Sequence, residues 1–94
     1  MSVEGTAAQA ASGAWARAAA ALREGNHQGA QQALGELSRS PDTRTRDAAL
    51  LAQAELDLGG GAAPQARAVL TNLAANGATP YIRERARQIL AEKK

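Results

Sequence analysis

Apolar residues recur at intervals of three and four along most of the chain, the spacing that places side chains on one face of an α-helix. Residues 15–22 and 51–58 carry alanine, leucine and a tryptophan at these positions. The spacing returns in 30–37, 66–73 and 86–90, with glutamine, arginine and glutamate between the apolar positions. The pattern predicts amphipathic helices at 7–24, 27–38, 41–58, 63–76 and 80–92.

Turn and capping residues separate these segments. Gly25-Asn26 is expected to end the first helix, with the asparagine capping the second, and Gly59-Gly60-Gly61 is expected to form the next hairpin turn. Ser40-Pro41 and Thr79-Pro80 each place a hydroxyl before a proline. These pairs predict an N-cap followed by proline at the first helical position, where the missing N–H costs nothing. Pro64 is expected to open a helix in the same way.

Composition favours helices and one small domain. Apolar residues make up 45% of the 94-residue chain, but alanine dominates, Phe is absent, and there is one Trp and one Tyr. Alanine is the strongest helix former and is depleted in strands. The length allows a single core. We therefore predict an all-α domain at residues 6–94 and disorder at residues 1–5.

Shifting the sequence by 36 residues against itself pairs like residues with like. The eight pairs that define this internal repeat are Trp15/Leu51, Ala18/Ala54, Leu22/Leu58, Gly25/Gly61, Ala30/Ala66, Ala33/Val69, Leu34/Leu70 and Leu37/Leu73. Because alanine is abundant here, the Leu and Gly pairs carry most of the evidence for the repeat. Each unit is therefore expected to be a helix, a glycine-containing turn and a second helix.

The order of these residues resembles the tetratricopeptide repeat, a helical hairpin of about 34 residues. The resemblance covers roughly residues 12 to 92. It rests in the first unit on Trp15, Gly25, Ala30, Leu34, Leu37 and Pro41, and in the second on Leu51, Gly61, Ala66, Leu70 and Leu73.

The resemblance implies antiparallel helical hairpins in a right-handed superhelix. Repeat one would cover 12–40, repeat two 41–77, and a capping helix 80–92 would close the open end of the stack. It also implies a non-catalytic module for protein–protein interaction. By analogy with similar alanine- and arginine-rich domains, the chain is expected to belong to a larger bacterial regulatory or envelope protein.

In the resembling family the first helix of each hairpin lines a concave groove. Gly13 and Ala16 would face this groove here. The partner-binding residues implied on that mapping are Arg17, Ala20, Arg23, Ala49, Ala52, Gln53 and Leu56. A shallow floor of small residues with basic edges suits a peptide or helix that is acidic at its flanks. The alternative is that Leu56 packs on the last helix and the groove is filled.

The last predicted helix concentrates positive charge. Residues 80–94 hold five basic and two acidic residues, a net charge of +3, while the whole chain carries +2. Arg83, Arg85 and Arg87 could bind phosphates or an acidic partner. No aromatic residue accompanies them for base stacking, and basic residues late in a helix also stabilise it through its dipole. Nucleic-acid binding is therefore the weaker interpretation, and a self-associating helical bundle is another alternative.

No residue pattern predicts catalysis or a cofactor. His27 is the single histidine and no other metal ligand stands at a motif spacing from it. Asp42, Asp47, Glu55 and Asp57 are expected to form surface ion pairs with nearby arginines. The glycine run lacks the lysine and hydroxyl residue of a phosphate-binding loop. We expect no enzyme activity, no bound metal, no cofactor and no small-molecule substrate.

The sequence carries no signal for export or membrane insertion. Residues 1–11 lack a positively charged start and a continuous apolar run, and no apolar stretch approaches the length of a membrane span. There is no cysteine, which excludes disulfides and thiolate metal sites. We expect a soluble, monomeric bacterial domain of the cytoplasm or the periplasm, with a protein partner that the sequence does not identify.

Overall fold

The computed structural model describes residues 3–61 and 63–92, and it is all-α. No strand occurs in these residues. The observed helices lie close to the predicted ranges. They are α1 (Val3–Arg23), α2 (His27–Leu37), α3 (Thr43–Gly60), α4 (Ala63–Asn76) and α5 (Pro80–Glu92).

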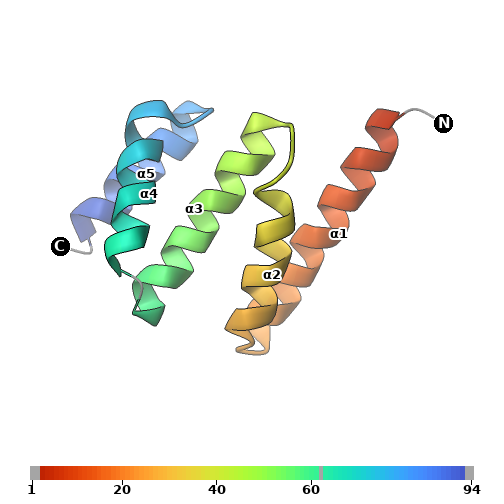
Figure 1. Cartoon of the computed structure of the whole chain (residues 1–94), viewed down its shortest axis with the longest axis horizontal. Helices are drawn as coiled ribbons and strands as arrows, with labels where there is room; N and C mark the ends of the chain where they lie inside the picture. The colour runs from red at the N-terminus through yellow and green to blue at the C-terminus, as the bar shows by residue number, and fades with distance from the viewer. Residues whose placement is uncertain (1–2, 62, 93–94) are drawn as a thin grey trace.

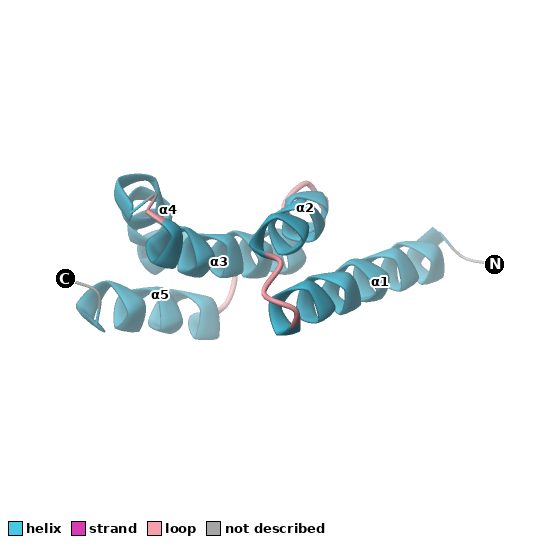
Figure 2. Ribbon diagram, turned by 90° about the horizontal axis from the view of Figure 1, so that it is seen from below, coloured by secondary structure: helices cyan, strands magenta, loops and turns pink. Residues whose placement is uncertain are grey.

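Consecutive helices run antiparallel and pack side by side (Figure 1). Seen from below, α2 and α4 lie on one side, α1 and α5 on the other, and α3 lies between them (Figure 2). The result is a thin, elongated molecule with extents of 47 × 30 × 16 Å. Its surface therefore has two broad faces, and α1 and α5 flank α3 on one of them.

The two hairpin turns use glycine for its backbone freedom. Gly25 and Gly61 adopt positive φ angles of 75° and 98°, and they stand 36 residues apart, as the internal repeat predicts. Asn26 caps α2 by accepting a hydrogen bond of 3.0 Å from the Gly29 N–H, which confirms its predicted role. The second turn is shorter than predicted, because α3 continues through Gly60 and only Gly61 is left-handed.

Proline opens α5 as predicted but does not open α3. Thr79 accepts a hydrogen bond from the Ile82 N–H at 3.2 Å, directly before Pro80. The prediction that Ser40 caps a helix starting at Pro41 is wrong. Asp42 is the cap, since its carboxylate accepts from both the N–H and the hydroxyl of Thr45, at 3.2 and 2.7 Å.

Two hydrophobic clusters share α3. The larger cluster joins α3, α4 and α5 around Leu51, Leu70, Leu73, Ile82 and Ile89. The smaller one joins α1, α2 and α3 around Ala14, Ala18, Ala33, Leu34, Leu37 and Ala49. Bulky side chains thus hold the C-terminal three helices together, while alanines form most of the contact between the first hairpin and α3.

The turn between α4 and α5 is fixed by a buried carboxylate. Asp47 of α3 is only 4% exposed, and it accepts from the Ala78 N–H at 2.9 Å and from the Arg46 guanidinium at 3.0 Å. The expectation that Asp47 lies at the surface is therefore wrong. Arg83 donates to the Gly77 carbonyl at 2.8 Å in the same turn. A charge-assisted hydrogen bond from the Ala78 N–H to this buried carboxylate fixes the position of the turn on α3.

The predicted domain limits extend to residues that the structure does not describe. Of the five residues expected to be disordered, 3–5 lie in α1, and 1–2 lie outside the described residues. The predicted cap at 80–92 coincides with α5, which packs on α4 and on α3.

Gly77→Ala is expected to destabilise the protein. An added Cβ would lie 2.6 Å from the Leu73 carbonyl oxygen and 2.9 Å from Ile82 Cγ2, so the backbone must shift. We expect a loss of about 1–3 kcal/mol in the free energy of unfolding, measured by urea denaturation followed by circular dichroism. Gly13→Ala is the matched control. A Cβ at this helical position meets no neighbouring atom, so we expect a gain of about 0.5–1 kcal/mol. Equal effects of the two changes would contradict this packing of the α4–α5 turn.

Asp42 is expected to make stability depend on pH in the acid range. Hydrogen bonds from Thr45, first its hydroxyl and then its N–H, hold the pKa of Asp42 below the usual value of 3.8. A carboxyl whose pKa is lowered by folding stabilises the protein above its unfolded pKa, and this stabilisation is lost as the pH falls through the folded pKa. Asn caps helices as well as Asp does but does not titrate. Asp42→Asn should therefore reduce the fall in Tm between about pH 5 and about pH 2, and an unchanged pH profile would contradict this role.

Candidate partner-binding groove

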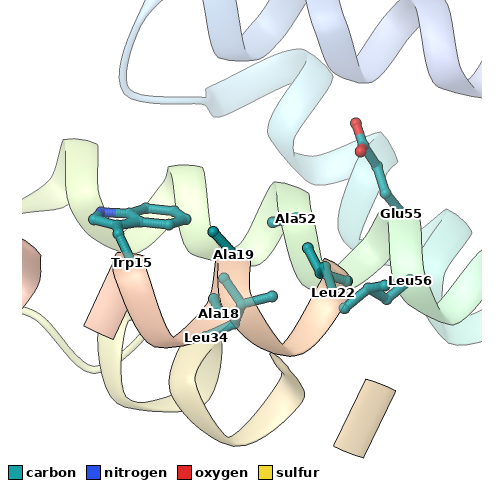
Figure 3. A pocket seen from close by; sticks show the side chains of 8 residues that line it. All are labelled: Trp15, Ala18, Ala19, Leu22, Leu34, Ala52, Glu55 and Leu56. Carbon is teal, nitrogen blue, oxygen red and sulfur yellow. The ribbon is translucent and has the colours of Figure 1, made fainter. Parts of the chain in front are cut away.

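A pocket of about 390 Å³ opens between α1 and α3. Its lining is mostly apolar, and Glu55 is the one ionisable side chain among the described residues that line it. Figure 3 shows side chains of α1 facing those of α3 across the pocket, with the Glu55 carboxylate pointing away from the apolar groups. The lining residues are Trp15, Ala18, Ala19, Leu22, Leu34, Ala52, Glu55 and Leu56.

The pocket exists because α1 does not pack along α3. In the described part of the chain, α1 packs on α2 and α2 packs on α3, whereas the backbones of α1 and α3 make few close approaches. α3 and α5, by contrast, are in direct contact. Leu34 of α2 lies 1% exposed at the base of the gap, and half-buried Trp15 and Leu56 form its sides. We refer to this space as the α1–α3 groove.

Several apolar side chains that line the groove remain partly exposed. Leu22 keeps 45% of its surface accessible, although burial of a leucine side chain is favourable. Leu56 packs against the smaller cluster of α1, α2 and α3, and not against the cluster that contains α5. The alternative in which Leu56 covers the last helix and fills the groove is therefore not what the structure shows.

The structure brings two of the predicted site residues into the groove. Ala52 and Leu56 line it, while Gln53 is half-buried on α3 close to Gly35 of α2. Ala49 is fully buried in the smaller cluster, so it cannot touch a partner in the folded protein. Its prediction as a binding residue is wrong, because α2 packs over this side of α3.

The residues predicted on α1 do not line the groove. Arg17 is turned to α2, where its guanidinium pairs with Glu36 at 2.5 Å. Ala20 is half-buried and Arg23 is exposed, and both lie outside the lining. Gly13 and Ala16, which were also expected to face the groove, lie outside it too. Arg17 and Arg23 therefore do not supply the basic edges that the sequence predicted for the groove.

The groove uses the face of α1 that sequence reasoning assigned to the core. Trp15, Ala18, Ala19 and Leu22 recur at helical spacing and form one apolar stripe. The stripe faces both α2 and the gap in front of α3, so some of its residues are core and others are accessible. The signal that distinguishes them is the small side chain at position 52 of α3: Ala52 lines the pocket and is too short to fill the space in front of α1.

The arginines of α5 are engaged with other groups of the chain. Arg83 donates to the Gly77 carbonyl, Arg85 pairs with Glu55 at 3.3 Å, and Arg87 pairs with Glu84 at 3.5 Å. Arg87 also donates to the Ala74 carbonyl. These contacts spread the three side chains over different neighbours, so they do not form one phosphate-binding stripe.

The described residues contain no group of three or more His, Asp or Glu side chains placed to hold a metal ion. His27 is exposed at the first turn of α2. None of the described helices is both long and apolar enough to cross a membrane.

Comparison of the chain with protein-family models, with curated proteins and with solved structures gave no match. The function is therefore inferred from the groove itself.

Ala49 and Ala52 are expected to respond differently to enlargement. Ala49→Leu places extra methyl groups in a closed core and should cost about 1–3 kcal/mol of unfolding free energy. Ala52→Leu directs the same groups into the groove, so we expect a change within about 0.5 kcal/mol. Urea denaturation of the two variants measures the difference. A similar cost for both would show that the α1–α3 groove is closed in solution.

Proposed function

We propose that this chain is a non-catalytic protein–protein interaction module that binds a short helix or peptide of a partner protein in the α1–α3 groove. The observation that carries the proposal is the open apolar pocket with Trp15, Leu22 and Leu56 at its sides. Partly exposed aromatic and leucine side chains around a concave site are typical of surfaces that receive the apolar anchors of an amphipathic helix.

The scale of the groove supports a short ligand. A pocket of about 390 Å³ accepts a few side chains rather than a whole protein surface. Affinity depends on the quality of a few anchors more than on area. We therefore expect dissociation constants in the micromolar range, roughly −8 kcal/mol.

The proposal includes a tetratricopeptide-like architecture. On this view α1–α2 and α3–α4 are two repeats in a right-handed superhelix. α5 then occupies the place that the first helix of a third repeat would take. Three features support it: the 36-residue spacing of the positive-φ glycines, the equal spacing between the starts of α2 and α4, and the antiparallel packing of consecutive helices.

The chemistry of the groove supports binding rather than catalysis. General acid–base catalysis requires titratable groups that converge on a substrate. Among the described residues that line the groove, Glu55 alone is ionisable, and it is paired with Arg85 at the rim.

Two other functions have less support. Self-association would bury the exposed Leu22, and also Tyr81, which is 72% exposed on α5. These two side chains lie on different helices, so they do not form one apolar patch. Light scattering that shows a monomer at high concentration would exclude self-association. Nucleic-acid binding through α5 is disfavoured by the internal contacts of its arginines.

Ala19→Gln is expected to abolish partner capture without unfolding the protein. Ala19 is exposed and lines the groove, so a longer side chain fills the entrance, while Gln is a good helix former. Ala16→Gln is the matched control, because Ala16 is also exposed on α1 but lies outside the lining. The measurement is affinity capture from a cell lysate, treated or untreated with nuclease.

A discrete polypeptide retained by the natural chain and by Ala16→Gln, and lost with Ala19→Gln, supports the proposal. Equal capture by all three chains would place binding outside the groove. Capture that disappears after nuclease treatment would instead support nucleic-acid binding by α5.

A further inference from the structure

The α1–α3 groove continues into a second pocket on the same side of α3. This second pocket, of about 310 Å³, lies between α3 and α5 and is lined by Glu55, Leu58, Arg85, Ile89 and Glu92. Glu55 belongs to both linings, so the two pockets adjoin at its side chain. Figure 2 shows α1 and α5 flanking α3 on this face. A ligand long enough to extend beyond the groove at Glu55 would meet the second pocket.

The two pockets occupy equivalent places in the internal repeat but differ in chemistry. A shift of 36 residues relates Ala19 to Glu55, and Leu22 to Leu58. The same shift relates Leu56 to Glu92. Two apolar positions of the first pocket are thus carboxylates in the second. The combined surface is apolar at the α1 end and charged at the α5 end.

The charge of this surface is set by two carboxylates and one guanidinium. Glu55 and Arg85 form an ion pair with side chains 42% and 37% exposed, and Glu92 is exposed. Among the described lining residues these are the ionisable groups, and their sum is −1. Arg17, which the sequence placed at the groove, is held by Glu36 on the other side of α1.

We propose that the occupant is a segment of a partner protein that carries an apolar anchor for the α1–α3 groove followed by a lysine or arginine that pairs with Glu55. This inference rests on the proposed function and reverses the charge expected for the partner. The cation of the ligand competes with Arg85 for the Glu55 carboxylate. Arg85 therefore acts as a weak internal competitor of the ligand at this site.

Because of this competition, two substitutions are expected to change the affinity for a cationic peptide in opposite directions. Glu55→Gln removes the acceptor and should weaken the binding of a cationic peptide about 2–5-fold, the range of an exposed ion pair. Arg85→Gln frees the acceptor and should tighten binding by a similar factor. Both substitutions break the same Glu55–Arg85 pair. If the pair only stabilised the structure, both would therefore change the peptide affinity in the same direction. Glu84→Gln, which breaks the exposed pair with Arg87, is the control and should have no effect.

The probe is a displayed library of random peptides about 16 residues long, enough for a helix of roughly 24 Å. Peptides are selected on the intact chain. Trp15 reports occupancy of the groove, because it is the single tryptophan and lines the pocket. Bound peptides should protect it from acrylamide quenching and shift its emission to shorter wavelength. Selected sequences are expected to combine Leu, Ile or Phe with Lys or Arg on one side, and their affinity should fall with added salt.

The outcomes separate the two proposals. Peptides that protect Trp15, lose binding in Ala19→Gln, and respond oppositely to Glu55→Gln and Arg85→Gln support both. Peptides that protect Trp15 but are acidic, or respond equally to the two changes, overturn the inference and leave the groove as a binding site. A library that yields no peptide able to protect Trp15 overturns the proposed function and, with it, this inference.

Discussion

The packing of α2 against α3 joins the first hairpin to the rest of the chain. This contact is built from Ala33, Leu34 and Leu37 of α2 and Ala49 of α3, and the backbone of α1 makes few close approaches to α3. Small side chains bring helix axes together but bury little surface for each residue. The position of α1 therefore depends on α2, and the α1–α3 groove is the space that this indirect attachment leaves open.

The polar contacts between helices also join α1 to α2 and α2 to α3. Arg17 joins α1 to α2, Gln31 donates to Asp57 at 2.8 Å between α2 and α3, and Asp47 fixes the α4–α5 turn on α3. Among the hydrogen bonds and ion pairs of the described side chains, these link elements that already pack together. They fix the register of neighbouring helices. Among the side chains that the structure describes, no such link crosses the apolar gap between α1 and α3, which agrees with its proposed use for an external ligand.

Helical spacing, glycines and capping residues were enough to predict the helices from the sequence. Gly25, Gly61, Asn26 and Thr79 act locally, so their roles can be inferred without knowing the tertiary structure. The cap at Asp42 was missed because a Ser-Pro pair lies directly before it and gives the same signal. Sequence alone does not decide between neighbouring caps, since the choice depends on which side chain reaches the free N–H groups.

The site was harder to predict because it depends on the rotation of one helix against another. Ala49 and Ala52 are the same residue type one helical turn apart, yet one is covered by α2 and the other lines the groove. Asp47 could not be distinguished from its exposed neighbours in the sequence, because the Ala78 N–H that it binds lies 31 residues away. A resemblance to a repeat family gives the approximate face but not this rotation, and an error of one residue turns the side chain by about 100°.

The separation of the two hydrophobic clusters has a consequence for how the chain opens and folds. Most contacts join helices that are neighbours in sequence, a topology that folds quickly because few long loops must close. The cluster around Leu70 and Leu73 keeps its bulky side chains when the first hairpin is detached, whereas the first hairpin keeps mainly alanines. Partial unfolding should therefore begin at α1 and α2, and their amide protons should exchange with solvent before those of α3, α4 and α5.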